Sequence, residues 1–234
     1  MISFENLKLS GELLDILRQF KIDFVFQPIY SRQGIVAYEA LMRPEGMSIG
    51  ELICRFREKG KLHDLELASF FGAAAAFRER GCQGRLHINS FPSECLTKEE
   101  VKEFTDNFGD FNGRLVIEIL ELSQPEKAVW DAKQKYVNER GGLDVSLDDF
   151  GSGYSDMQAV DYYNPKVVKL DRLLISGIDH DKAKQAAVRG YIRNFRDRGI
   201  SCILAEGVEN EKEYRCLRAM GLDMFQGYYL GIPC

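Results

Sequence analysis

Short runs of apolar residues alternate along this chain with longer segments in which apolar positions recur every three or four residues. The short runs are rich in β-branched and aromatic side chains, as buried strands are, and the longer spacing is that of amphipathic helices. The short runs predict strands at residues 24–30, 35–43, 85–90, 115–121, 144–150, 167–172, 201–207 and 224–229. The periodic segments predict helices at residues 48–59, 64–80, 97–108, 124–139, 155–163, 179–198 and 210–220.

The start of the chain carries a helical pattern without a strand beside it. Leu13, Leu17 and Phe20 lie at the spacing of one helix face. We therefore expect an N-terminal helical lead over residues 1–23 and a single domain over residues 24–234. No Pro- or Ser-rich linker divides the second range, so we expect its strands and helices to share one core.

The alternation of the predicted strands with helices favours a closed barrel, an α/β fold. One connection breaks the pattern, because only residues 31–34 separate the first two strands. A parallel crossover needs about a dozen residues or more, so these two strands must form an antiparallel hairpin. We therefore predict a TIM-like (β/α)8 barrel with one antiparallel strand, and we assign the reversed direction to the second strand, residues 35–43.

The composition is that of an ordinary globular protein: of 234 residues, 45% are hydrophobic and 29% are charged. The chain contains no apolar run of about 18 residues, so we expect no membrane-spanning helix. Its first residues include acids and lack an apolar block followed by a cleavage site, which argues against a signal peptide. We therefore expect a cytoplasmic protein.

Charge and cysteine content narrow the range of partners. The net charge is −5, from 31 basic and 36 acidic residues. This balance argues against a nucleic-acid polymer as a partner, because proteins that bind one need a basic face. The six cysteines are scattered and only three histidines are present, so a zinc site or a disulfide framework is disfavoured and we expect reduced thiols.

Polar side chains interrupt the predicted strands near their ends. The strand at 144–150 carries the pair Asp148 and Asp149, and the strand at 201–207 carries Glu206. In a parallel barrel the carboxyl ends of the strands meet on one face, where active sites are built. The side chains expected at this face are Glu39, Asn89, Glu118, Glu121, Asp148, Asp149, Lys169, Asp171, Glu206 and Gln226.

Convergent carboxylates and an amide are the ligands that Mg²⁺ or Mn²⁺ prefers. Without a cation, these acids would repel one another in a partly dry site. Asp148 and Asp149 could bridge two ions about 3.5–4 Å apart, as in two-metal phosphoryl transfer. The alternative is structural: an acid at a strand end often caps a helix, Asp149 could be a turn residue, and Lys169 could pair with a neighbouring carboxylate. For the set as a whole we favour the metal site.

The segment Glu39-Ala40-Leu41-Met42-Arg43 resembles the signature from which the EAL domain family takes its name. Further motifs follow in the order of that family, namely FQPI from Phe26, INS from Ile88, EILE from Glu118, DDFGSGYS from Asp148, KLDR from Lys169, AEGVE from Ala205 and QGY from Gln226. The resemblance runs from about Phe24 to the end of the chain and implies a bacterial phosphodiesterase that opens cyclic di-GMP to linear pGpG. It also implies a TIM-like barrel with one antiparallel strand and a homodimer. Because no other signalling domain precedes residue 24, we expect a stand-alone EAL domain or one excised from a longer protein.

The resemblance further implies a role for each matching residue. The implied metal ligands are Glu39, Asn89, Glu118 and Asp148 for one ion, and Asp148, Asp149 and Glu206 for a second. The implied catalytic residues are Lys169, Glu206, Gln226 and Glu121. Lys169 would orient or polarise the attacking water, Gln226 would join the network of water and metal, and Glu121 would anchor the loop that follows Asp149. The implied substrate-binding residues are Gln27, Leu41, Arg43 and Asp171.

Two segments depart from the family pattern. After Arg43 the family usually continues with a Trp-x-His-Pro-like loop, whereas residues 44–48 lead directly into the next helix. Leu120 and residues 122–123 replace the usual Thr-Glu-Ser pattern around Glu121. Arg43 itself could form a surface ion pair, but its place in the EALMR segment favours a phosphate contact.

Three functions are consistent with these residues. The first, which we favour, is metal-dependent hydrolysis of cyclic di-GMP. The second is a non-catalytic EAL domain that binds cyclic di-GMP or a partner protein; such members typically lack a metal ligand, and this chain lacks none of them. The third is a preference for another cyclic or linear dinucleotide, because the metals would contact phosphate and not the base.

Overall fold

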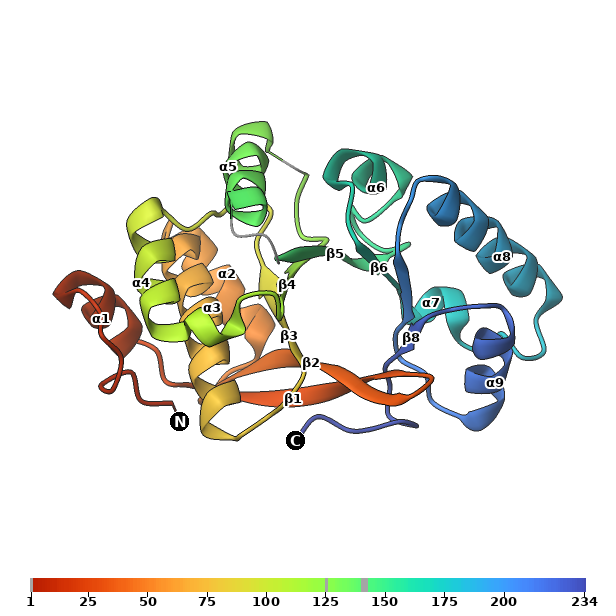
Figure 1. Ribbon diagram of the computed structural model, residues 1–234, viewed down its shortest axis with the longest axis horizontal. Coiled ribbons are helices and arrows are strands. Elements are labelled where there is room, and N and C mark those ends of the chain that lie inside the picture. Colours follow the sequence, from red (N-terminus) through yellow and green to blue (C-terminus); the bar gives the residue numbers. More distant parts are fainter. Residues whose placement is uncertain (1, 125, 140–142) are drawn as a thin grey trace.

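The strands close into a barrel in the computed structural model, which describes residues 2–124, 126–139 and 143–234 (Figure 1). They stand around the barrel in chain order. Over the described ranges the strands are β1 (Ile22–Ser31), β2 (Gly34–Pro44), β3 (Arg85–Ser90), β4 (Leu115–Ile119), β5 (Asp144–Phe150), β6 (Val167–Leu170), β7 (Cys202–Ala205) and β8 (Met224–Phe225). This arrangement confirms the predicted TIM-like (β/α)8 barrel with one antiparallel strand.

Helices cover the outside of the barrel (Figure 1). In the described part of the chain they are α1 (Gly11–Arg18), α2 (Ile49–Glu58), α3 (Leu62–Glu79), α4 (Lys98–Phe108), the 3-10 turn η1 (Gly109–Phe111), α5 (Lys127–Glu139), α6 (Met157–Tyr163), α7 (Arg172–Ile175), α8 (Lys182–Asp197) and α9 (Glu211–Ala219). The helix expected at 124–139 begins at Lys127, and Pro125 lies outside the described residues. The turns η1 and α7 are too short to show a helical period in the sequence.

The reversed strand is β1, so the assignment of the reversed direction to residues 35–43 is wrong. β1 runs antiparallel to both of its neighbours, β2 and β8, whereas β2 runs parallel to β3. A short loop sets only the relative direction of the two strands that it joins. The long connection from β2 through α2 and α3 to β3 is a parallel crossover, and it aligns β2 with the strands that follow.

Several strands end earlier than the apolar pattern predicts. β8 is limited to Met224–Phe225 because the chain turns away at Gly227, where φ is +154°. A Cβ atom at Gly227 would lie 2.2 Å from backbone atoms of Val208, so the crossing of these two segments requires glycine. The shorter strands leave four predicted site residues on the segments that follow them: Glu121, Asp171, Glu206 and Gln226.

Capping side chains set where α2 and α4 begin. Ser48 and Glu51 form a capping box at the start of α2, and Thr97 and Glu100 form another at the start of α4. In each box the hydroxyl accepts from a backbone N–H inside the helix, while the glutamate accepts from the N–H of the cap residue. The cap at Ser48 starts α2 directly after the short segment that follows β2, and this brings the first turn of α2 to the rim of the barrel.

The N-terminal helix α1 packs against α3 and is shorter than the expected lead. Its Leu13 and Leu17 are buried, as the helical spacing predicts, whereas residues 2–9 are not helical. None of the described helices combines the length and the apolar character needed to cross a membrane.

A buried polar cluster holds the end of β3. Glu66 of α3 accepts hydrogen bonds from Ser90 Oγ at 2.5 Å and from the Phe91 N–H at 2.9 Å. Lys133 of α5 lies 3.3 Å from the same carboxylate and donates to the Phe91 carbonyl at 2.7 Å. Glu66 is fully buried and Lys133 is 5% exposed. The cluster therefore ties the strand end that carries Asn89 to two outer helices.

Glu66→Ala should lower the free energy of unfolding by about 3–5 kcal/mol, because it leaves the Lys133 ammonium buried without its carboxylate. Chemical denaturation followed by circular dichroism measures the change. Asp106→Ala removes the partner of an exposed ion pair with Lys102 and serves as the control, with an expected loss below about 1 kcal/mol. Equal losses in the two variants would contradict the argument from burial.

Candidate active site

Lys169 of β6 lies among carboxylates from other strands and strand ends. Its Nζ is 3.2 Å from Glu39 Oε2 and 2.9 Å from Glu118 Oε2. It is also 2.7 Å from Asp148 Oδ1 and 2.7 Å from Glu206 Oε1. The Lys169 side chain is 1% exposed, so these contacts lie inside the barrel. The structure thus brings these predicted site residues together from five strands and strand ends.

Amide side chains orient Glu39. Gln226 Nε2 donates to Glu39 Oε2 at 2.7 Å and to Gln27 Oε1 at 3.2 Å. Asn89 Nδ2 donates to Glu39 Oε1 at 3.4 Å. Gln27 stands directly opposite Glu39 in the register of β1 and β2. Gln27, Asn89 and Gln226 therefore belong to one network with Glu39.

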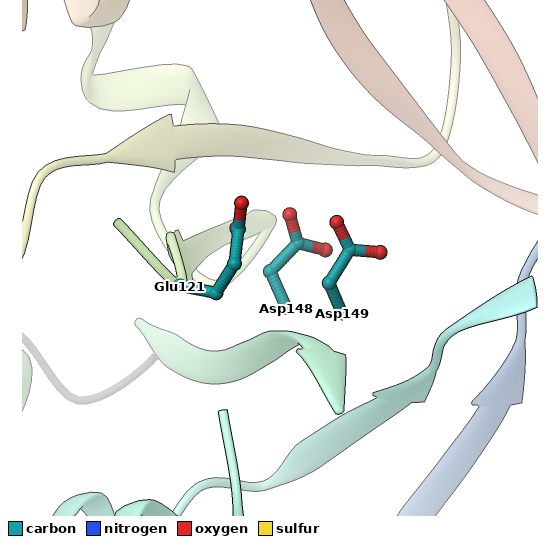
Figure 2. A group of neighbouring side chains, drawn as sticks. All are labelled: Glu121, Asp148 and Asp149. Atoms are coloured by element: carbon teal, nitrogen blue, oxygen red, sulfur yellow. The ribbon is translucent and has the colours of Figure 1, made fainter. Parts of the chain in front are cut away.

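Three carboxyl groups lie side by side at the end of β5 and after β4, as Figure 2 shows. Glu121, Asp148 and Asp149 each offer one oxygen, and these atoms lie within 4.8 Å of one another. Asp149 has a φ of +45°, a left-handed conformation that residues other than glycine rarely adopt. Burial raises the pKa of the Asp149 carboxyl, and the neighbouring carboxyls of Glu206 and Asp171 also act on it.

Glu121 also supports the loop that follows Asp149. Its backbone carbonyl accepts from the Tyr154 N–H at 3.2 Å. A Cβ atom at Gly153, where φ is +51°, would lie 2.8 Å from that carbonyl oxygen, so the loop needs glycine there. The loop therefore rests on the backbone of Glu121, while the Glu121 carboxyl faces the aspartates.

The pKa values of the carboxyl groups around Lys169 reflect both burial and an excess of acids over positive charge. Burial raises the pKa of Glu118 to about 8 and raises the pKa values of Asp148 and Glu206 well above their usual range. Burial acts on Glu39 as well, but Lys169 and the amide donors outweigh it, and the pKa of Glu39 is lowered. Burial by itself would lower the pKa of Lys169, yet the surrounding carboxylates raise it well above its usual value. One ammonium does not balance the acids around it.

Two buried oxygen atoms of the site have no hydrogen-bond donor among the described residues: Asp148 Oδ1 and Gln226 Oε1. Lys169 Nζ is close to Asp148 Oδ1, but the contact lacks the angle of a hydrogen bond. Buried polar atoms are rarely left without a partner. Carboxylate and amide oxygens gathered in this way suit a hard divalent cation, so the residues present fit Mg²⁺ or Mn²⁺.

His87 is a site residue that the strand-end pattern does not reveal. It is 1% exposed, and its Nδ1 lies 2.6 Å from Glu118 Oε1. Burial, together with the charge of Lys169, lowers the pKa of His87 to about 3, so the imidazole is neutral, and its Nδ1 shares a hydrogen bond with the Glu118 carboxyl. The available signal in the sequence is the position of His87 two residues before Asn89, which places both side chains on one face of the strand.

Leu41 and Arg43 line a cavity of about 250 Å³ beside the carboxylates, together with Ile49 and Ile53 of α2. Arg43 is exposed and donates to the Met42 carbonyl at 3.1 Å. No ion pair joins Arg43 to another residue in the ranges that the structure describes. The guanidinium is therefore available to an anion, and the alternative of a surface ion pair is not found.

A second cavity, of about 350 Å³, is lined by Glu39 itself and shares Leu41 with the first. Its lining includes Gln27, Glu206, Gln226, Arg172 and Tyr228. Asp171, which was expected to contact the substrate, does not line this cavity. Its Oδ1 caps α7 by accepting from the Leu173 N–H at 2.6 Å, and its carboxyl contacts Asp149. The structure therefore places Asp171 beside the Asp149 carboxylate and away from the described lining of both cavities.

Comparison with known proteins identifies the same family as the sequence motifs. The EAL domain family model matches residues 10–233. The cyclic di-GMP phosphodiesterase PdeF of Escherichia coli (strain K12) is 26% identical over 245 residues, which cover 98% of this chain and 32% of PdeF. The chain spans about half or less of the length of the curated relatives that it matches.

Solved structures of EAL proteins superpose on this fold. A standalone versatile EAL protein from Vibrio cholerae O395, in its c-di-GMP-bound form, has a TM-score of 0.80 and 28% identity, with 92% of each chain covered. Klebsiella pneumoniae BlrP1, in a complex with manganese and cy-diGMP, has a TM-score of 0.74 and 26% identity over 91% of this chain and 56% of BlrP1. With the motifs in place around a barrel of the same architecture, the chain belongs to the EAL domain family.

Proposed function

We propose that this chain is a metal-dependent phosphodiesterase that hydrolyses cyclic di-GMP to linear pGpG by attack of an activated water. The observation that carries the proposal is the cluster around Lys169, where buried carboxyl groups outnumber the ammonium that they contact. The activity in the name of PdeF and the ligands in the V. cholerae and BlrP1 structures support this choice of substrate and of cation.

We assign two Mg²⁺ or Mn²⁺ ions to the site, as in two-metal phosphoryl transfer. The residues that would hold the first ion are Glu39, Asn89, Glu118 and Asp148. The residues that would hold the second ion are Asp148, Asp149 and Glu206. When bound, such ions lower the pKa of a water molecule and neutralise the phosphodiester. Glu206 is close enough to Asp149 to act on its pKa, so one cation could take an oxygen from each.

The remaining polar groups would position water and substrate. Lys169 keeps its proton, because the carboxylates raise its pKa, so its ammonium can orient the attacking water and stabilise charge on the phosphate. Gln226 Oε1, which is buried without a described donor, can accept a hydrogen bond from that water. Arg43 would contact a phosphate oxygen from the rim of the cavity that it shares with Leu41.

We also propose that the chain acts in the cytoplasm as a homodimer. All six cysteines lie in the described ranges and are free thiols, which suits a reducing compartment. Tyr154 is 51% exposed and Leu173 is 70% exposed, on the segments that follow Asp149 and Asp171. Large exposed apolar side chains near a site are typical of interaction surfaces.

The first prediction concerns the metal. Purified protein incubated with cyclic di-GMP should form pGpG in the presence of Mg²⁺ or Mn²⁺ and none in EDTA, because the water is activated by the ions. Chromatography of the products measures the conversion. Formation of pGpG in EDTA would contradict the metal requirement. Intact substrate under every condition, from folded protein, would favour a non-catalytic receptor instead.

Glu39→Ala should abolish turnover, because it removes a ligand that two amide side chains hold in place. The fold should persist, because the change also relieves repulsion among the buried acids. Hydrolysis rate and melting temperature measure the two effects. Glu45→Ala, which alters an exposed glutamate just after β2, is the matched control and should hydrolyse at the normal rate. Near-normal turnover in Glu39→Ala would refute the assignment of this ligand.

Lys169→Met keeps the length of the side chain and removes its charge. It should lower kcat by about 10²–10³-fold with little change in KM, because the ammonium acts on the reacting groups and not on substrate affinity. Steady-state kinetics in saturating Mn²⁺ measures both constants. Lys166→Met, at an exposed position before the same strand, is the control. A raised KM with an unchanged kcat would show that Lys169 serves binding instead.

A further inference from the structure

His87 is buried beside a proposed metal ligand, although it takes no part in the chemistry proposed above. It lies in β3, and its register partner in β2 is Glu39. His87 is 1% exposed, whereas the other described histidines, His63 and His180, have side chains that are 33% and 78% exposed. Burial of a polar ring is unfavourable unless the ring has a partner, so the contacts of His87 indicate its role.

The partner of His87 is the carboxylate of Glu118. His87 Nδ1 lies 2.6 Å from Glu118 Oε1, and Lys169 Nζ lies 2.9 Å from Glu118 Oε2. Side chains from β3 and β6 thus contact the two oxygens of one carboxyl group in β4, one at each oxygen. A carboxylate has about four lone pairs, so each oxygen keeps one for a cation. Without the donor at Oε1, the group would be free to turn about its last bond.

We propose that His87 is a positioning residue that fixes the carboxylate of Glu118 for binding of a divalent cation through its Nδ1–H. This inference rests on the proposed function, because it requires the ion site to which Glu118 was assigned. Partners that hydrogen-bond to a metal ligand typically contribute about 10–100-fold to metal affinity or activity. Loss of the His87 donor therefore weakens cation binding while every ligand stays in place.

The matched variants His87→Asn and His87→Gln test which nitrogen position matters, because each places an amide donor at only one of the two ring-nitrogen positions. The amide nitrogen of asparagine falls near the position of Nδ1, whereas that of glutamine falls near the position of Nε2. Calorimetric titration with Mn²⁺ should give an affinity within about threefold of the wild type for His87→Asn and about 10–100-fold weaker for His87→Gln. Wild-type affinity in His87→Gln, or equal losses in both variants, would overturn the proposal. Circular dichroism verifies that each variant is folded.

A second measurement uses the wild-type protein and therefore tests the proposal even if a variant fails to fold. Nitrogen-15 NMR of histidine-labelled wild-type protein without metal should show one neutral imidazole with its proton on Nδ1, because the proposal requires His87 to donate to Glu118 Oε1. A proton on Nε2 would overturn the proposal. The metal titration also distinguishes the two levels of inference. Wild-type protein that binds no Mn²⁺ refutes the ion site itself, whereas normal Mn²⁺ binding in both wild type and His87→Gln refutes only the role of His87.

Discussion

The protonated amine of Lys169 inside a ring of carboxylates is the interaction on which the site depends. Its Nζ lies 2.7–3.2 Å from oxygens of Glu39, Glu118, Asp148 and Glu206. Opposite charges attract strongly in a dry interior, but the acids outnumber the amine and repel one another. Burial, and after it the repulsion among these acids, raises the pKa values of most of the carboxyls. Protons or divalent cations must supply the missing positive charge, and the oxygen donors present suit the cations.

The reversal of β1 brings amide groups to this ring. The antiparallel register sets Gln27 opposite Glu39, and β1 meets β8 where Tyr30 faces Phe225. Gln226 follows β8 directly, so its Nε2 reaches both Gln27 Oε1 and Glu39 Oε2. The departure from a regular (β/α)8 barrel is thus part of the site, because it supplies the contacts that orient Glu39.

Two buried acids outside the ring of carboxylates around Lys169 hold the segments that carry the residues of the ring. Glu66 fixes the end of β3 through Ser90, as described above. Glu213 of α9 does the same for the loop after β7, because its carboxylate accepts from the Glu209 N–H at 3.0 Å and from the Gly177 N–H at 2.8 Å. Each of these acids is at most 4% exposed. The ligands therefore stand on strand ends that packing and hydrogen bonds already hold in place.

Much of this protein was predictable from local features of the chain. Apolar spacing determines the strands and helices, the short loop determines the hairpin, and the motifs identify the acids. The direction of β1 depends on the crossover that aligns β2 with β3, and the end of β8 depends on the passage of Gly227 against Val208. The pairing of His87 with Glu118 likewise requires adjacent strands in one register. The sequence determined the elements and the chemical groups, and only the closed barrel decided which groups meet, because burial and hydrogen-bond partners come from residues far apart in the chain.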